Sequence, residues 1–215
     1  VSSIGMLFRG VVRAVTARKG EQPSSDTRQE PTIGFADLVG ITAVTEKVDA
    51  AAFMAAMVQF EREVQDAVVD HGGTVVKLIG DEVMFATPDP VSAVRVAAAL
   101  VGIGRDIPGL DGMRVGLAYG QVIRSGGDFY GTVVNTAARI VGQAYPDAIV
   151  ATQRVVDALR AHERASDPPG QVCEAQPLGP HDLRGIQQPV ELYRLRPLPS
   201  NHGTSQKHDL GTRHL

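Results

Sequence analysis

The chain has 215 residues, of which 43% are hydrophobic and 21% charged, with 21 basic against 24 acidic side chains. This balance is ordinary for a soluble globular protein and excludes collagen-like, mucin-like and wholly disordered chains. The formal charge of −3 argues against a surface that coats nucleic acid, so no nucleic-acid polymer is expected as a partner. The single cysteine, Cys173, excludes a disulfide framework and a Cys-rich zinc site. No run approaches about 18 uninterrupted apolar residues, which favours a cytoplasmic protein without a membrane-spanning helix.

Residues 1–30 differ from the rest of the chain and are expected to form a basic amphipathic segment followed by a linker. Near-helical spacing is seen for Ile4, Phe8, Val11 and Val15. Two interpretations remain open: the segment packs on its own domain, or residues 1–19 contact an anionic membrane surface. A secretory signal is not predicted, because arginines interrupt the apolar run. Residues 20–31 are polar and have the composition of a linker.

The next part of the chain alternates between strand and helix patterns. Residues 32–38 have the composition of a buried strand, and residues 50–70 place apolar side chains on one helical face. Strands at 74–78 and 82–87 flank a Gly-Asp turn and predict a hairpin. The remaining predicted elements are a helix at 90–102, strands at 113–119 and 121–124, a helix at 132–143, a strand at 148–151, a helix at 153–160 and a strand at 190–195.

The order of these elements predicts the fold class. It is β-α-β-β-α-β with further elements after it, which is typical of a ferredoxin-like α+β domain. We therefore expect an antiparallel-rich sheet with helices on one face and C-terminal additions, over residues 31–196. Residues 197–215 are rich in Pro, Gly, Ser and His and are expected to be a disordered tail.

Two carboxylates stand at the ends of predicted strands. Asp37 ends the apolar strand in GFADLVGIT, and Asp81 lies in the turn of VVKLIGDEVMFAT. An unpaired carboxylate is costly to bury, and a turn-capping role is the alternative for either side chain. If the two strands are neighbours, the carboxylates repel each other unless a divalent cation binds between them, with phosphates as further ligands.

Four further polar residues are candidates for ligand binding. Lys77 lies inside the apolar run VVKLI, where it either extends from a sheet edge to solvent or binds a specific partner. The segment GGDFYGTVVNTAARI carries Asp128 after a flexible turn, and Asn135 and Arg139 on the helix that follows. The last two are four residues apart and share a helical face. They form either a solvated pair or a phosphate site, because the guanidinium donors of Arg suit phosphate.

Together these residues resemble the catalytic domain of the class III nucleotidyl cyclases, the adenylyl and guanylyl cyclases. The segments that carry the resemblance, in order over residues 31–196, are FADLVGIT, KLIGDEVMFA, RVGLAYGQV, GGDFYGTVVNTAARI and LRGIQQPVELYRL. The resemblance implies conversion of ATP to 3′,5′-cyclic AMP and pyrophosphate, by attack of the ribose 3′-hydroxyl on the α-phosphate. It also implies two Mg²⁺ or Mn²⁺ ions in each active site.

The resemblance implies a role for four of these residues in binding metal and base. Asp37 and Asp81 would be the metal ligands, and Lys77 and Asp128 would select the purine. Lys is a pure donor and Asp a pure acceptor, so the pair complements the acceptor N1 and the donor amino group of adenine. Guanine reverses these two groups, and guanylyl members of the family typically carry Glu at the Lys77 position. ATP is therefore the expected substrate.

The resemblance also implies roles for three residues that act on sugar and phosphates. Asn135 would position the ribose, and Arg139 would stabilise charge on the α-phosphate in the transition state. Arg184, in the Leu-Arg-Gly of the last motif, aligns with a basic residue, usually Lys, that contacts the terminal phosphates. The change to Arg keeps the charge but alters its geometry.

In the resembled family the active site lies between two catalytic domains, so the resemblance implies a head-to-tail homodimer with two equivalent sites and an inactive monomer. The expected division gives one copy Asp37, Asp81 and Lys77, and the other copy Asp128, Asn135 and Arg139. Two alternative functions remain open. A catalytically silent nucleotide-binding or dimerisation module would usually lack one of these residues. A diguanylate cyclase shares the Gly-Asp-Glu turn, but this chain has Ile79 and Val83 where that family expects Gly and Phe.

Overall fold

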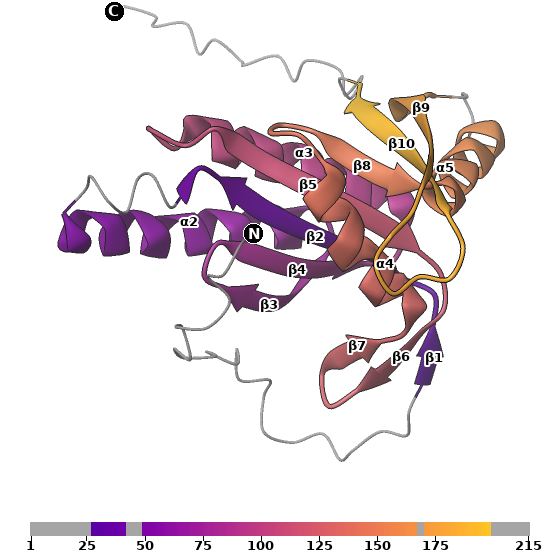
Figure 1. Cartoon of the computed structure of the whole chain (residues 1–215), viewed down its shortest axis with the longest axis horizontal. Coiled ribbons are helices and arrows are strands. Elements are labelled where there is room, and N and C mark those ends of the chain that lie inside the picture. The colour runs from indigo at the N-terminus through magenta and orange to yellow at the C-terminus, as the bar shows by residue number, and fades with distance from the viewer. Residues whose placement is uncertain (1–26, 42–48, 167–169, 199–215) are drawn as a thin grey trace, which may run out of the picture.

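The computed structural model describes residues 27–41, 49–166 and 170–198 (Figure 1). These residues form a seven-stranded sheet and a smaller three-stranded sheet. In spatial order the larger sheet contains β3 (Thr74–Ile79), β4 (Glu82–Thr87), β2 (Thr32–Val39), β5 (Gly112–Tyr119), β8 (Ile149–Thr152), β10 (Val190–Pro197) and β9 (Cys173–His181). The smaller sheet, called the ribbon below, contains β1 (Thr27–Gln29), β6 (Val122–Ser125) and β7 (Asp128–Tyr130). The helices are α2 (Ala50–Asp70), α3 (Pro90–Asp106), α4 (Thr132–Ile140, continued by a 3-10 turn at Val141–Gln143) and α5 (Gln153–Ala165).

The element order confirms the predicted fold class. The core runs β2-α2-β3-β4-α3-β5, and its strands lie side by side in the order β3-β4-β2-β5. The paired strands described here are antiparallel, apart from β5 and β8, which run parallel. The remaining strands, β8, β10 and β9, extend this sheet as the expected C-terminal additions.

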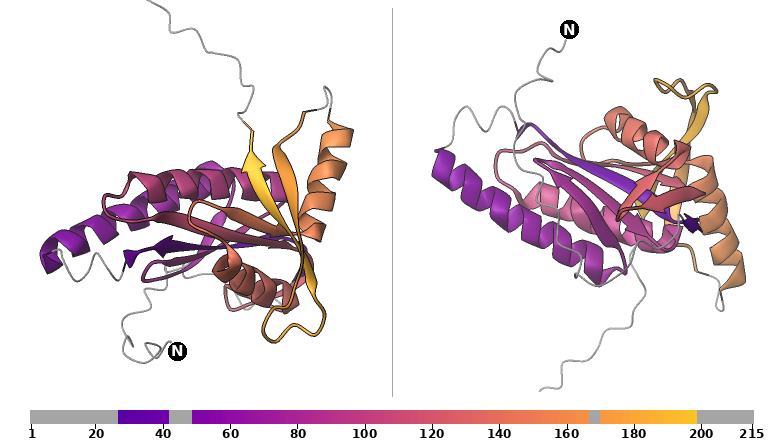
Figure 2. Two further views of the ribbon diagram at one scale, coloured as in Figure 1. Left: turned by 45° about the horizontal axis from the view of Figure 1, so that its top comes forward. Right: turned by 90° about the horizontal axis from the view of Figure 1, so that it is seen from below.

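Helices cover both faces of the larger sheet, so the expectation of helices on one face is wrong for α4. Helices α2, α3 and α5 share the main hydrophobic core, whereas α4 packs on the opposite side (Figure 2). The pattern of β2 explains this cover, because the strand carries apolar side chains on both of its faces. Ala36 and Leu38 belong to the main core, and Ile33 and Phe35 pack in the cluster beneath α4. A strand that is apolar on both faces requires cover on both.

A glycine allows α4 to approach the sheet closely. A Cβ at Gly116 of β5 would lie 2.6 Å from the backbone nitrogen of Val141 and 2.9 Å from the carbonyl oxygen of Ala137. No side chain fits there, so the RVGLAYG motif fixes how α4 lies on the sheet. This close packing fixes the distance of α4 from the sheet, and with it the position of the polar face of the helix.

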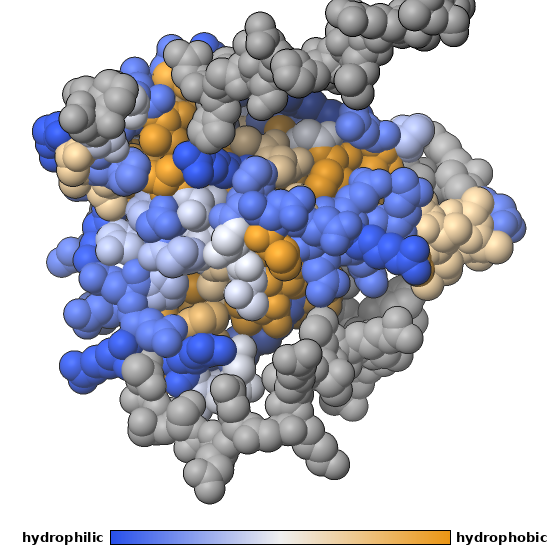
Figure 3. All heavy atoms as spheres, turned by 180° about the vertical axis from the view of Figure 1, so that it is seen from behind, coloured by the Kyte–Doolittle hydropathy of each residue, from blue (hydrophilic) through white to orange (hydrophobic). Residues whose placement is uncertain are grey.

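The surface on the α3 side is largely hydrophilic, with smaller hydrophobic areas among the described residues (Figure 3). One of these belongs to the first half of α2, where Met54 and Val58 are exposed. The helix begins at its N-cap Asp49, whose carboxylate accepts from the backbone amides of Ala51 and Ala52. No helix in the described ranges has the length and apolar character needed to span a bilayer.

Three short or polar strands escaped the sequence analysis. Strand β1 lies inside the segment expected to be a linker, but its backbone pairs with β6. Strand β7 has only three residues, too few for a period to show. Strand β9 contains Pro177 and Pro180, which argue against a strand, yet β9 is an edge strand and tolerates proline. The expectations for residues 1–26 and 199–215 lie outside the described residues.

Candidate active site

Asp37 lies at the C-terminal end of β2, in a row of charged residues that crosses the sheet. Its register partners are Glu82 on β4 and Arg114 on β5. Directly paired residues project from the same face of an antiparallel sheet, and this is the face that carries α4. The Oδ2 atom of Asp37 accepts from Nε of Arg114 at 2.9 Å and from a second guanidinium nitrogen. The carboxylate is therefore held in place and its charge is balanced.

Asp81 lies in the β3–β4 turn, next to the end of β2. Gly80 precedes it with a φ of +64°, a left-handed conformation that glycine adopts without strain. The pKa of Asp81 is raised overall. Burial is the largest cause, the charge of Asp37 adds to it, and a backbone hydrogen bond partly opposes it. The neighbouring Glu82 also has a raised pKa, first from burial and then from Asp37 and Asp81. Asp37 and Asp81 are therefore close enough for the charge of Asp37 to disfavour the charged form of Asp81.

This pair of carboxylates fits the binding of hard divalent cations that also contact a substrate. No group of three or more His, Cys, Asp or Glu side chains in the described ranges is arranged to hold a metal. Mg²⁺ commonly binds through one or two carboxylates and completes its octahedron with waters and substrate phosphates. Two repelling carboxylates at a partly open strand end match that donor set. Asp37 and Asp81 are the residues that would hold the ions.

Lys77 and Asp128 meet across the gap between the two sheets. The ammonium group of Lys77 on β3 donates to Oδ2 of Asp128 on β7, in an ion pair. The other carboxylate oxygen, Oδ1, accepts from the backbone amide of Phe129 at 2.8 Å. The Asp128 side chain is 20% exposed and the Lys77 side chain 43%, so both groups are accessible to a ligand.

This contact bears on the expected division of residues between two copies. The sequence analysis placed Lys77 with Asp37 and Asp81, and assigned Asp128 to the other copy. Within one chain, however, Lys77 and Asp128 bind each other, so the structure favours a division that keeps them on the same copy. The pair is one unit of the site.

A β-bulge brings Lys77 to this side of the sheet. The β3–β4 register shifts between Val75 and Lys77, which leaves Val76 as the extra residue. Val75 and Leu78 pack against the main core, whereas Val76 packs in the cluster beneath α4. Val76 and Lys77 therefore share a face, although strict alternation would separate them. Without the bulge, the lysine would not face β7.

Asn135 and Arg139 lie on the exposed face of α4, one turn apart. Neither side chain forms a hydrogen bond or ion pair within the ranges that the structure describes. The loop between β9 and β10 carries the exposed Arg184. Its neighbour Leu183 packs in one cluster with Ile140 of α4, so this loop lies against the helix (Figure 1). The structure does not bring these three polar groups into contact with Asp37, Asp81 or the Lys77–Asp128 pair.

Three residues of the site escaped the sequence analysis. Arg114 binds Asp37, and its signal was a lone charge in the apolar strand MRVGLAY. Ile79 and Tyr130 are 60% and 53% exposed, which is unusual for large apolar side chains. Ile79 lies two positions after Lys77 on β3, and Tyr130 two positions after Asp128 on β7, so each lies on the same face of its strand as that residue.

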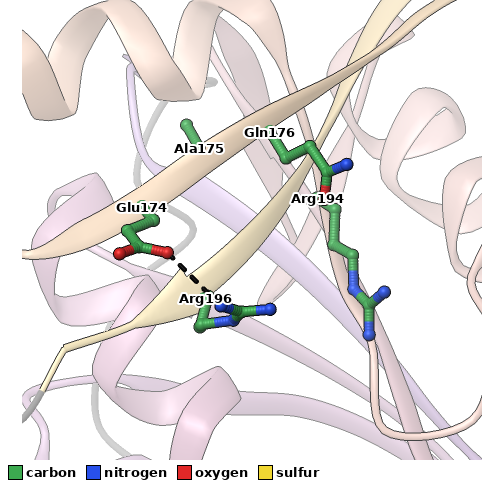
Figure 4. Close-up of a pocket in the computed structure, with 5 residues that line it drawn as sticks. All are labelled: Glu174, Ala175, Gln176, Arg194 and Arg196. Carbon is green, nitrogen blue, oxygen red and sulfur yellow. Dashed lines mark ion pairs between the residues drawn. The ribbon is translucent and has the colours of Figure 1, made fainter.

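A separate hollow lies on one face of the paired strands β9 and β10 (Figure 4). It is lined by Glu174, Ala175, Gln176, Arg194 and Arg196, and Glu174 pairs with Arg196 at 3.5 Å. Both of these side chains are largely exposed, so the pair contributes little to binding or stability. The hollow contains none of the candidate residues.

Comparisons with known proteins identify the family to which this chain belongs. The family model of the adenylate and guanylate cyclase catalytic domain matches residues 24–196. An adenylate cyclase of Streptomyces coelicolor is 34% identical over 169 residues, covering 77% of this chain and 43% of that protein. An uncharacterized protein of Mycobacterium tuberculosis is 38% identical over 171 residues, covering 78% of this chain and 41% of that protein. This chain therefore spans less than half the length of these relatives.

A solved structure confirms the fold. The crystal structure of the adenylyl cyclase CyaB from P. aeruginosa matches with a TM-score of 0.69 and 19% sequence identity, over 83% of this chain and 100% of that one. At this identity the likeness concerns the fold alone, while the family match over residues 24–196 covers most of the chain. The chain belongs to the family of adenylate and guanylate cyclase catalytic domains.

Proposed function

We propose that the chain is an adenylyl cyclase of the cytoplasm that converts ATP to 3′,5′-cyclic AMP and pyrophosphate. The observation that carries the choice of ATP is the Lys77–Asp128 pair, a donor beside an acceptor in an accessible position. Lys77 would donate to N1 of adenine, and Asp128 would accept from the exocyclic amino group. The exposed side chains of Ile79 and Tyr130 would cover the apolar faces of the base.

Asp37 and Asp81 would hold two Mg²⁺ or Mn²⁺ ions together with the triphosphate. When bound, the ions would lower the pKa of the ribose 3′-hydroxyl and neutralise charge on the phosphates. Arg114 balances the Asp37 carboxylate when no cation is present, and its guanidinium would remain beside the phosphates afterwards. The roles of the two carboxylates are to bind and to orient, so that the 3′-oxygen and the α-phosphorus come into line.

The residues of α4 and the β9–β10 loop would act on sugar and phosphates. Asn135 would orient the ribose, Arg139 would donate to the α-phosphate as negative charge builds there, and Arg184 would bind the terminal phosphates. Asn135 and Arg139 face outward from their own domain, away from the strands that carry the metal-binding carboxylates. An outward-facing set of this kind supports a site completed by a second copy of the chain.

The dimer would be head-to-tail, with two equivalent sites. One copy would supply Asp37 and Asp81. The other would supply Lys77, Asp128, Asn135 and Arg139, because Lys77 and Asp128 are one unit within a chain. An isolated copy would hold half of each site and would be inactive.

Product formation by the purified chain tests the proposal. The protein is incubated with ATP or GTP and with Mg²⁺ or Mn²⁺, and the nucleotides are separated by chromatography. We expect cyclic AMP from ATP and little cyclic GMP from GTP. A folded dimer that forms neither product with either metal would contradict the proposal and leave a silent nucleotide-binding module.

A further inference from the structure

Selection between adenine and guanine depends on the order of a donor and an acceptor, not on their presence. Along the edge that would meet Lys77 and Asp128, adenine offers an acceptor at N1 and a donor at the amino group. Guanine offers a donor at N1 and an acceptor at O6. A lysine and an aspartate that can exchange places satisfy either base. The pair therefore discriminates only if its order and spacing are held fixed.

The two residues belong to different sheets, so their spacing depends on how the ribbon is attached. Lys77 lies on the edge strand β3 of the larger sheet, and Asp128 lies on β7 of the ribbon. A hollow of about 210 Å³ lies at this junction, lined by Val75 and Val76 from β3 and by Arg124, Gly127 and Phe129 from the ribbon, among others. The junction is thus incompletely packed on one side.

Two ribbon side chains pack in the cluster beneath α4: Val122 of β6 and, next to Asp128 on β7, Phe129. Its ring packs against the buried cluster formed by Ile33, Met84, Ala86, Ala118, Val122 and Ala137, which includes residues of β2 and β4. Val76, next to Lys77, packs against the same cluster. On the outer side, the guanidinium of Arg124 lies 5.9 Å from the centre of the Phe129 ring. The ring therefore joins the strand of Asp128 to the sheet of Lys77.

The backbone of Phe129 also orients the carboxylate. Its amide donates to Oδ1 of Asp128 at 2.8 Å, which leaves Oδ2 for Lys77. Any shift of Phe129 moves the atom that fixes the rotation of this carboxylate. The ring of Phe129 and its backbone amide therefore both act on the position of the Asp128 carboxylate.

We propose that Phe129 is a positioning residue for purine selection, acting through Asp128. This inference rests on the proposed cyclase function, for which Phe129 would fix the relative positions of Lys77 and Asp128. When the ring is removed, the ribbon can move relative to β3, and the carboxylate can turn to accept from N1–H of guanine while Lys77 donates to O6. Discrimination then falls, while the metal-binding and phosphate-binding residues keep their places.

The test compares kcat/KM for ATP and for GTP in wild type and Phe129→Ala. We expect the ATP-over-GTP ratio to fall about tenfold or more, mainly through KM for ATP, with kcat changed only a few-fold. Phe129→Leu retains apolar bulk and should restore most of the ratio. The matched control is Phe53→Ala on α2, which removes a half-buried ring that packs on the other side of the larger sheet. It should leave the ratio unchanged.

A merely structural role would lower activity with both nucleotides equally. An unchanged ratio in folded Phe129→Ala would therefore overturn the proposal, as would an equal change in Phe53→Ala. If Phe129→Ala does not fold, Val76→Ala trims the same junction and should lower the ratio about threefold, and no change there overturns the proposal. Wild-type protein that makes no cyclic nucleotide would contradict the proposed function instead. In that event the ratio of the ATP and GTP dissociation constants, measured calorimetrically in the same variants, decides on Phe129.

Discussion

Asp37 and Asp81 are brought together by neighbouring strands of one sheet, whereas Lys77 and Asp128 meet across two sheets. The first pair needs only the β2–β4 pairing and the β3–β4 turn. The second needs a bulge at Val76, a ribbon built from distant segments and a side chain that fixes the ribbon. The Asp37–Asp81 region is thus defined by local pairing, and the Lys77–Asp128 region by tertiary packing. Substitutions should affect metal-dependent chemistry in the first region and base selection in the second.

The largest effect is expected from Asp37→Ala. Cyclase activity should fall about a thousandfold or more, because one of two carboxylates for the cations is lost. The melting temperature should change little, since the Asp37 side chain is partly exposed. The matched control is Asp157→Ala, which removes an exposed carboxylate on α5. Retention of full activity by Asp37→Ala would contradict the metal role.

Lys77→Ala should act on the choice of base. We expect the ATP-over-GTP ratio of kcat/KM to fall about a hundredfold, because the donor for N1 of adenine is lost and Asp128 loses its partner. Measurement of both nucleotides under the same conditions separates this effect from a general loss of activity. Arg160→Ala, an exposed cation on α5, serves as the control. An equal loss with ATP and GTP would show that Lys77 does not read the base.

Asp81→Asn should abolish activity and yet stabilise the fold slightly at neutral pH. The folded pKa of Asp81 lies above its unfolded value, so the folded protein binds its proton at a higher pH than the unfolded chain does. The charged carboxylate therefore costs stability at pH 7, and the cost disappears as the pH falls below about 4. We expect a rise in melting temperature of about 2 °C at pH 7 that vanishes in acid. A gain that persists below that pH would contradict this reasoning.

Arg114→Ala should lower the melting temperature at pH 7, which is the opposite of the effect expected for Asp81→Asn. It removes the cation that binds Asp37 and that lowers the pKa of Asp81 and of Glu82. The three carboxylates then repel one another without compensation, so the melting temperature should fall at pH 7 and recover as the pH is lowered. Thermal unfolding followed by circular dichroism at several pH values measures both variants together.

The strand pairing around Asp37 and Asp81 was predicted from the sequence, and that around Lys77 and Asp128 only in part. The strand at 32–38 and the hairpin around Asp81 follow from composition and turn chemistry, and they place the two carboxylates together. The contact between Lys77 and Asp128 was not predictable, because the bulge at Val76 breaks the two-residue period that a strand pattern relies on. Of the ribbon, only the strand at 121–124 was predicted, since β1 and β7 are short and are defined by backbone pairing.

The most direct test of the division between the two regions mixes two impaired variants, Asp37→Ala and Lys77→Ala. If each site takes Lys77 from the copy that supplies Asp128, a heterodimer of the two variants has one site with both substitutions. Its other site carries neither substitution and is intact. At equal concentrations about half of the dimers are mixed, so activity should recover to about a quarter of wild type, measured at ATP well below KM. Lys77→Ala mixed with Arg139→Ala is the matched control and should show no recovery, because both changes then lie on one half. No recovery in the first mixture, despite demonstrated heterodimers, would contradict the account.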